Sequence, residues 1–475
     1  MCFACGRSSF ASLRSRADGH TSMITRDETT TALPTTLVDA ASVAAFRVGF
    51  GALMLVATVR FAARGWIDEI LDRPTFHFTF TFFEWVKPLP QPWLDVQYAV
   101  MAVSATLLML GVRARVSAGV FFVLFTWAEL IEKAAYLNHY FLVSLVALLL
   151  TLVRTDQCFA LLPEARSVDD DGRIDARLLW LFRGQVIVVY AAAGLAKVSS
   201  DWLVHAEPLR IWLQHTAHLP VIGPLLSSTI GAHAFSIGGC LFDLTIWAFI
   251  LWRRTRAVAY VAAVGFHLTV WALFPIGLFS PVMMLAATLL FSPSWPRRLL
   301  RLAPKTMTTT PTTTTWPTYL VALWLTVQVL LPLRHYAIAG DTNWTELGFR
   351  FAWRVMLIEK TGSVEYRVVV DGKPPVRVFP ADELTELQQR QLRTQPDLIR
   401  QYARHLEDTF VAGGARDVRV YADAWASLNG RAAQRLIDPT VDLASVDDCI
   451  WSASWIVPLT TPFPMRMTPS RTGAP

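Results

Sequence analysis

The stretch "LLWLFRGQVIVVYAAAGLAK", residues 178–197, decides the fold class of this protein. It is almost entirely apolar, and Lys197 is the only charged side chain between residues 185 and 200. About 20 consecutive apolar residues are what a helix needs to cross the hydrocarbon core of a bilayer. The stretch therefore predicts a membrane-spanning helix that ends in a lysine.

The composition of the whole chain indicates the same environment. Hydrophobic residues make up 53% of the 475 residues and charged residues only 17%, which is too hydrophobic for a soluble domain of this length. Comparable apolar runs recur at residues 40–60, 94–111, 116–134, 138–153, 178–196, 233–252, 257–274, 276–292 and 317–333. We predict a polytopic α-helical membrane bundle of about nine spans, followed by a small α+β extracytoplasmic domain.

Basic residues in the loops predict the orientation of the bundle. Thirteen Lys and Arg residues fall in the loops on the N-terminal side and seven in the loops on the opposite side. Because Lys and Arg are held on the cytoplasmic side, we expect the N-terminus in the cytoplasm. An odd number of spans then places the C-terminal domain outside, and we expect the membrane to be the bacterial inner membrane.

Composition also divides the chain into three regions. Residues 1–36 are rich in Ser, Thr and Arg without an apolar core, which predicts a disordered cytoplasmic tail. Residues 37–336 form the membrane domain, with a low-complexity Thr-rich linker at 305–316. Residues 337–475 are charged enough to form a soluble α+β domain with its own core.

The soluble region has readable strand and helix patterns. "SVEYRVVVDGKPPVRVFP", residues 363–380, alternates apolar and polar residues across an Asp-Gly turn and predicts a β-hairpin. Asp382 is a candidate cap for the helix that contains "ELTELQQ", and Pro396 predicts the first turn of a second helix that ends before Gly413. "VRVYADAW", residues 418–425, predicts a further strand.

Polar side chains gather at the extracytoplasmic ends of the predicted spans. They are Glu129, Glu132, Lys133, Asn138, His139, Lys197 and Asp243, with His267 nearer the middle of a span. An ionisable group inside the membrane costs about 2.5 to 3.5 kcal/mol on insertion scales and marks a functional site by default. The structural alternatives stay open: Lys197 can snorkel to the interface, His139 can bond a backbone carbonyl, and Asp243 and His267 can join helices.

We predict neither a bound metal ion nor a nucleic-acid partner. The cysteines include one C-x2-C pair, Cys2 and Cys5, without a second pair, so we predict no metal site. The sequence contains no P-loop and no G-x-G-x-x-G motif. We also expect no nucleic-acid partner.

Several segments, taken in order, resemble the vitamin K-dependent gamma-glutamyl carboxylase family and its bacterial relatives with the HTTM membrane domain. The segments are "PTFHFTFTFFEWVKPLP" (74–90), "EKAAYLNHYFLVSLVALLL" (132–150), "VYAAAGLAKVSSDWL" (189–203), "FHLTVWALFPIGLFSPVMM" (266–284), "NWTELGFRFAWRVM" (343–356) and "VYADAWASLNGRAAQRLIDPTVD" (420–442). The resemblance covers about residues 40 to 460.

The resemblance implies an activity and its reactants. In that family a lysine deprotonates vitamin K hydroquinone, oxygen attacks, and the resulting strong base removes a γ-proton from a glutamate whose carbanion captures CO2. Lys197 matches the lysine and His139 matches a histidine of the family, so both are predicted catalytic residues. The implied reactants are phylloquinol or menaquinol as the lipid quinone, O2, CO2 and a Glu-containing peptide or protein, with the quinol converted to an epoxide.

Residues for the glutamate are predicted by chemistry and by the resemblance together. A carboxylate is held best by Arg or His, and the tentative substrate-binding residues are Asn138, His405, Arg431 and Arg435. Arg350 and Arg354 are further candidates on chemistry alone. Animal members of the family have a His and an Arg where this chain has Ile358 and Lys360, so glutamate binding here is expected to differ.

Two other functions fit the same sequence. One is a quinol-dependent membrane enzyme that acts on a non-protein substrate. The other is a non-catalytic membrane chaperone that resembles the lipase maturation factors, for which Lys197 would be dispensable.

Overall fold

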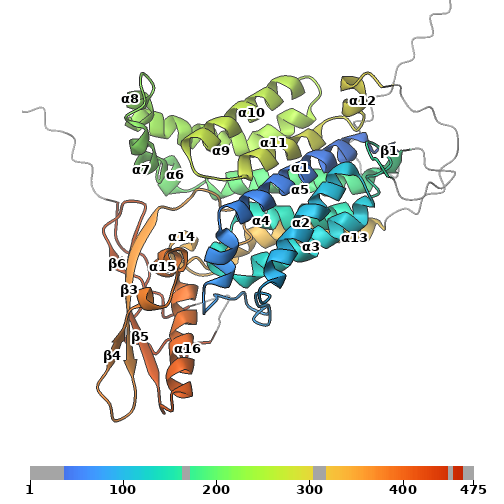
Figure 1. The fold of residues 1–475 in the computed structure, drawn as a ribbon. Coiled ribbons are helices and arrows are strands. Elements are labelled where there is room, and N and C mark those ends of the chain that lie inside the picture. Colours follow the sequence, from blue (N-terminus) through green and yellow to red (C-terminus); the bar gives the residue numbers. More distant parts are fainter. Residues whose placement is uncertain (1–36, 163–171, 303–316, 448–452, 464–475) are drawn as a thin grey trace, which may run out of the picture.

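The computed structural model describes residues 37–162, 172–302, 317–447 and 453–463. The predicted N-terminal tail (1–36) and Thr-rich linker (305–316) lie outside these residues. The described chain forms a long helical bundle with a smaller sheet-containing domain docked on one end (Figure 1).

Each of the nine predicted apolar segments forms a helix. Seven helices of the described residues are long and apolar enough to cross a membrane, and two apolar helices are shorter. The seven are α1 (Ala41–Ala63), α2 (Trp93–Leu110), α3 (Ala114–Ile131), α5 (Ala176–Ala196), α9 (Thr229–Leu251), α10 (Arg256–Leu273) and α13 (Thr318–Leu333), the last extended by η5 (Arg334–Ala337). The shorter two are α4 (Asn138–Leu152) and α11 (Phe279–Ala287) with η4 (Thr288–Leu290). The chain is an integral membrane protein.

Close helix contacts explain the compact core of the bundle. Gly51 on α1 faces the end of α2, where a β-carbon would lie 2.6 Å from the backbone nitrogen of Met109. Phe46, Phe50 and Met54 are buried on the same helix. Without a side chain at Gly51 the two helices can approach closely, as small residues commonly allow in membrane bundles.

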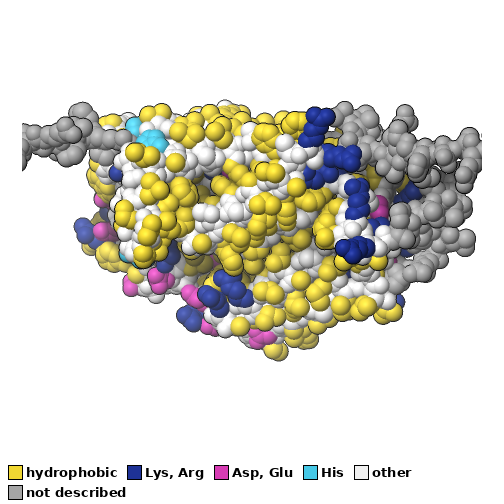
Figure 2. Space-filling view, turned by 90° about the horizontal axis from the view of Figure 1, so that it is seen from above, with side chains coloured by type: hydrophobic (Ala, Val, Ile, Leu, Met, Phe, Trp, Pro, Cys, Tyr) yellow, Lys and Arg dark blue, Asp and Glu magenta, His cyan; other side chains and the backbone are white. Residues whose placement is uncertain are grey.

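The end of the bundle away from the sheet domain is basic. It contains β1 (Leu37–Asp39), which pairs with β2 (Arg173–Asp175), and α12 (Trp295–Leu299), whose Arg297 bonds Asp39 at 2.8 Å. In Figure 2 the surface seen from above is largely hydrophobic, while Lys and Arg gather toward this end. A hydrophobic flank with a basic end is the pattern of a membrane bundle.

The opposite end of the bundle is built from short elements between the spans. They are η1 (Ile67–Asp72), η2 (Lys133–Ala135), α6 (Ser200–Leu203), α7 (Leu209–Leu213), η3 (Gln214–Thr216) and α8 (Gly223–Leu226). Here the C-terminal domain docks: Gln388 donates to the Glu132 carboxylate at 2.8 Å, and Gln401 donates to the Thr79 carbonyl at 2.9 Å.

The C-terminal domain is a small α+β unit. Its elements are α14 (Thr342–Thr345), β3 (Lys360–Val369), β4 (Val376–Val378), η6 (Pro380–Asp382), α15 (Glu386–Leu392), α16 (Pro396–Ala412), β5 (Arg419–Leu428) and β6 (Gln434–Arg435). The described strands form an antiparallel sheet in the order β4-β3-β5-β6. α16 covers one face, where Tyr366 donates to the Ile399 carbonyl at 2.9 Å.

The predicted elements of this domain are confirmed except for one helix cap. Val368 pairs with Val376 in the predicted hairpin, and Pro396 begins α16 as expected. Asp382 does not cap a helix, however. Thr385 caps α15 instead, in a reciprocal capping box with Gln388, and Asp382 lies in the preceding 3₁₀ turn. A Thr with Gln three residues later satisfies two backbone donors, which Asp382 cannot do from its position.

Candidate functional site

Lys197 lies at the C-terminal end of α5 and does not extend to the surface. Its ammonium contacts the Asp243 carboxylate at 2.8 Å and the Ala193 carbonyl at 3.3 Å, and the residue is only 7% exposed. Asp243 comes from the middle of α9, so the pair joins two spans. A buried charge is tolerated when it is paired and hydrogen-bonded, which explains how a lysine can occupy this position.

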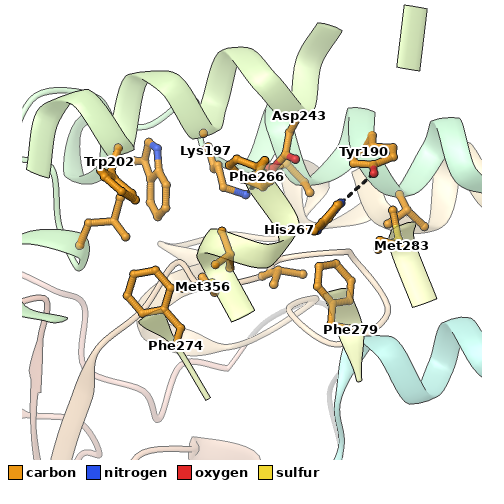
Figure 3. Close-up of a pocket in the computed structure, with 17 residues that line it drawn as sticks. Tyr190, Lys197, Trp202, Asp243, Phe266, His267, Phe274, Phe279, Met283 and Met356 are labelled. Carbon is orange, nitrogen blue, oxygen red and sulfur yellow. Dashed lines mark hydrogen bonds and ion pairs between the residues drawn. The ribbon is translucent and has the colours of Figure 1, made fainter. Parts of the chain in front are cut away.

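The pair lines an apolar cavity, here called the lysine cavity. Its other lining residues are Val189, Tyr190, Ala193, Trp202, Leu209, Phe235, Gly239, Phe266, His267, Val270, Phe274, Phe279, Met283, Val355 and Met356. The space inside it that the centre of a water-sized sphere can occupy is about 60 Å3. Figure 3 shows Lys197, Asp243 and Tyr190 on one side, with Phe274, Met356 and Phe279 facing them from the other.

A second polar pair lies in the same cavity. The Tyr190 hydroxyl and the His267 Nε2 are 2.8 Å apart, and both side chains are buried (Figure 3). Tyr190 and Lys197 are seven residues apart on α5, so two helical turns place them on the same face. The lysine cavity therefore combines an apolar, aromatic lining with two pairs of groups that can exchange protons.

A larger and more polar cavity lies between the bundle and the C-terminal domain. The centre of a water-sized sphere can occupy about 470 Å3 of it, and it is here called the basic cavity. His139 and Asn138, at the start of α4, contribute to its membrane side. Its charged lining residues are Arg60, Lys133, Glu346, Arg350 and Arg354, so positive charges predominate. Such a cavity favours an anionic ligand, because Arg forms strong charge-assisted bonds with carboxylates.

The charges of the basic cavity are held in fixed positions. The Asp397 carboxylate bridges Lys133 at 3.1 Å and Arg350 at 2.7 Å. Burial by itself would raise the pKa of Asp397, but the charges of Arg350 and Lys133 outweigh it and hold the pKa well below its usual range. Asp397 therefore remains ionised and orients two of the cations.

A second buried ion pair lies beside this network. Lys360 contacts Glu346 at 3.1 Å and donates to the Trp344 carbonyl at 2.7 Å. Burial raises the pKa of Glu346 and lowers the pKa of Lys360, while the attraction between them opposes both shifts. Lys360 is thus engaged with Glu346, whereas Ile358 lines the basic cavity directly.

The two cavities share one wall. Phe279, Val355 and Met356 line both of them. The Phe279 ring lies 6.3 Å from the His139 ring on one side and 6.4 Å from the His267 ring on the other. Gly277 adopts a left-handed conformation (φ 59°) in the turn that brings α11 against His139. Lys197 and His139 consequently face adjoining cavities rather than each other.

The remaining predicted residues lie in three different settings. Asn138 lines the basic cavity and donates to the Arg354 carbonyl at 3.2 Å. Arg431 bonds Asp201 of α6 with two contacts of 2.8 Å, so its carboxylate partner is part of this chain. His405, which contacts Glu383 at 2.7 Å, and Arg435, an exposed partner of Asp423, are not among the lining residues of either cavity.

Sequence reasoning did not assign roles to several residues that the fold brings to the cavities. The seven-residue spacing between Tyr190 and Lys197 could have placed both on one helix face. A single tyrosine in an apolar helix does not by itself indicate a functional site. The pairing of Asp243 with Lys197 joins residues 46 positions apart, and the bridge from Lys133 to Asp397 joins two domains. Neither contact follows from local spacing.

Family models match nearly the whole described chain. The HTTM domain matches residues 36–295, and the vitamin K-dependent gamma-carboxylase lumenal domain matches residues 313–462. The chain belongs to the vitamin K-dependent gamma-carboxylase family. No solved structure matches it at a significant level.

Both cavities depend on the two matched regions of this gamma-carboxylase family member. The lysine cavity lies chiefly among HTTM helices, yet Val355 and Met356 come from the lumenal domain. The basic cavity is formed where the two domains meet. The family's lumenal domain places this end of the molecule on the extracytoplasmic side.

Proposed function

We propose that this protein is a membrane gamma-glutamyl carboxylase that couples epoxidation of vitamin K hydroquinone to CO2 addition on glutamate. The observation that carries the proposal is the arrangement of the cavities: a buried amine in an apolar cavity adjoins a basic cavity across a thin wall. The first suits a lipid quinol and the second suits an acidic side chain.

The residues of the lysine cavity fit a quinol head group. An aromatic lining with a few converging polar groups is typical of a cofactor site. Trp202, Phe266 and Phe274 would hold the ring, and the Lys197 and His267 pairs offer partners for its hydroxyls. When bound, the quinol together with O2 supplies the strong base needed to remove a γ-proton from glutamate.

Lys197 acts as the general base in this proposal. An amine accepts a proton only when neutral, so this role requires the neutral form of Lys197 when the quinol binds. Asp243, 2.8 Å away, holds the Nζ atom in place and stabilises the ammonium after protonation. The apolar lining keeps water from the reacting groups.

The glutamate would bind in the basic cavity. Arg354, which bonds His335 and Asn343 rather than a carboxylate, would provide the cation for its carboxylate, and Arg350 and Lys133, paired with Asp397, lie in the same cavity. His139 lines the same cavity next to the shared wall, where it can orient the γ-carbon side of the substrate. Asn138 donates to the backbone carbonyl of Arg354. In this proposal it supports the chain around Arg354 and does not bind the substrate carboxylate.

Orientation in the membrane is part of the proposal. The end of the bundle that holds β1 and the start of α1 is rich in Arg and lies opposite the docked lumenal domain (Figures 1 and 2). We therefore infer a cytoplasmic N-terminus, in accordance with the positive-inside rule.

The test is carboxylation of a Glu-rich peptide by detergent-solubilised protein, with reduced vitamin K, oxygen and labelled bicarbonate. Wild type should fix label and form epoxide, whereas Lys197→Ala should do neither. Lys373→Ala, in the exposed hairpin turn, is the matched control and should behave as wild type. Equal label fixation by wild type and Lys197→Ala would refute the assignment of the base.

A second candidate differs only in the acceptor. Ile358 lines the basic cavity and Lys360 is bound to Glu346, so the cavity lacks two polar groups expected for a peptide glutamate. A non-protein carboxylate is the alternative acceptor. Epoxide formation by wild type without label on any Glu peptide would favour it.

A further inference from the structure

The chain between Arg210 and Asp243 has an unusual composition for a connection outside the membrane. Residues 211–242 contain no Asp, Glu, Lys or Arg, although they include α8 and the turns before it as well as the first half of α9. Connections on the aqueous side of a membrane protein normally carry charges. Apolar runs with few or no charges are typical of segments that lie in the hydrocarbon of a membrane.

The outward side of this segment is strongly apolar. Val221, Leu225 and Ile230 are 93%, 62% and 78% exposed, and Ile222 is also exposed. The same surface continues onto α9 through Ile237 and Leu241, which are exposed on a predicted membrane span. In Figure 1, α8 lies at the edge of the molecule beside the start of α9, away from the lumenal sheet.

The inward side of the same segment lies beside the lysine cavity. Leu209 on α7 and Phe235 on α9 line the cavity, and Leu213 and Leu226 belong to the apolar cluster around Trp202. Gln214 donates to the Ser227 carbonyl at 2.9 Å and closes the hairpin between these elements. The segment therefore connects two elements that line the cavity and packs against the apolar cluster beside it.

We propose that residues 211–230 lie in the extracytoplasmic leaflet as an element that does not span the membrane. They form a lateral entrance through which a long-tailed lipid reaches the lysine cavity. Val221, Leu225 and Ile230 contact acyl chains, and His215 and His218 remain at the level of the head groups. Lipid is a better occupant than a protein, because the side chains exposed at 221, 222, 225 and 230 are all aliphatic and the segment contains no Arg. The identity of the lipid as a quinol rests on the proposed function, whereas the position in the leaflet does not.

The position is tested by fluorescence quenching in phosphatidylcholine liposomes. Cys2, Cys5 and Cys449 are replaced by Ser, the buried Cys158 and Cys240 are kept, and one new cysteine is labelled in Val221→Cys, Leu225→Cys or Val411→Cys. Val411 is an exposed apolar residue on α16 and serves as the control. Labels at 221 and 225 should be quenched by doxyl lipids and shielded from iodide. The label at 411 should be quenched by iodide and not by doxyl lipids. Quenching by iodide at all three positions would overturn the proposal, and protection from both quenchers would indicate a protein partner and overturn it too.

The route is tested by substrate tail length. The double variant Val221→Asp with Leu225→Asp should raise the KM for a long-tailed quinol several-fold and leave the KM for a tailless quinol unchanged. Val221→Thr with Leu225→Met is the conservative control and should match wild type. Equal KM changes for both quinols would refute the lateral entrance. The quenching experiment needs no turnover, so it decides the position of the segment even if the wild type oxidises no quinol.

Discussion

Asp201 and Arg431, 230 residues apart in sequence, join the membrane domain to the lumenal domain through two hydrogen bonds of 2.8 Å. Asn429 donates a third bond to Asp201 at 2.9 Å, and its side-chain oxygen accepts from the Glu359 N–H at 2.8 Å. Asp201 directly precedes Trp202, which lines the lysine cavity. The docking contact between the domains therefore lies at the wall of the proposed active site.

Arg431→Ala is expected to destabilise the protein. It leaves the Asp201 carboxylate buried without its cation, a loss of about 3 to 5 kcal/mol for a buried pair, and both side chains are about nine-tenths buried. Thermal unfolding in detergent should show a clearly lower Tm. Arg435→Ala, which removes an exposed ion pair with Asp423, should change the stability by less than about 1 kcal/mol. Equal effects of the two variants would contradict the docking role.

Asp243→Asn is expected to slow quinol oxidation at least about tenfold with little loss of fold. The amide preserves shape but removes the charge that holds the Lys197 amine, and a positioned acid or base contributes about 100-fold or more to rate. The measurement is the rate of quinol consumption. Asp95→Asn, on the exposed start of α2, is the control. A rate equal to wild type would show that Lys197 works without Asp243.

Phe279→Ala is expected to uncouple the two half-reactions. Phe279 forms part of the wall between the cavities, so its truncation should admit water to the lysine cavity and connect it with the basic cavity. Epoxide formation should continue while the carboxylated product per epoxide falls several-fold. Phe249→Ala, on the exposed face of α9, should leave that ratio unchanged. An unchanged ratio in Phe279→Ala would mean that the wall does not control coupling.

Asp397→Asn is expected to remove a pH-dependent part of the stability. Because the pKa of Asp397 is held below its unfolded value of about 3.9, its contribution is fully present above about pH 4 and is lost as the pH falls through the lower folded-state pKa. Wild type should exceed the variant by about 3 kcal/mol at neutral pH. The difference should shrink below about pH 4 in unfolding experiments. A difference that does not vary with pH would show that the ion pairs with Lys133 and Arg350 are not its source.

Local patterns predicted the secondary structure well because each depends on neighbouring residues. Every apolar run became a helix, and the Asp-Gly turn formed the hairpin that pairs Val368 with Val376. The cap at Asp382 failed because Thr385 with Gln388 offers two reciprocal bonds, and such competition between adjacent candidates is not decided by residue type alone.

The candidate site was less predictable, because its contacts join distant parts of the chain. Lys197 and His139 stood out as polar residues near the membrane, but nothing in the sequence indicates that Phe279 lies between their cavities. Arg431 is an arginine suited to a carboxylate, and residue type cannot distinguish a substrate carboxylate from Asp201. The position of Phe279 between the cavities and the partner of Arg431 could be assigned only from the three-dimensional structure.

The shared wall of Phe279, Val355 and Met356 has a consequence for how this protein can be divided. Phe279 belongs to a membrane helix, while the other two residues come from the lumenal domain. A membrane domain expressed alone would have its lysine cavity open on one side, and a lumenal domain grafted from another member would bring its own wall. The lysine cavity is thus not a property of the membrane domain alone, and a change at Val355 or Met356 alters the lining of both cavities at once.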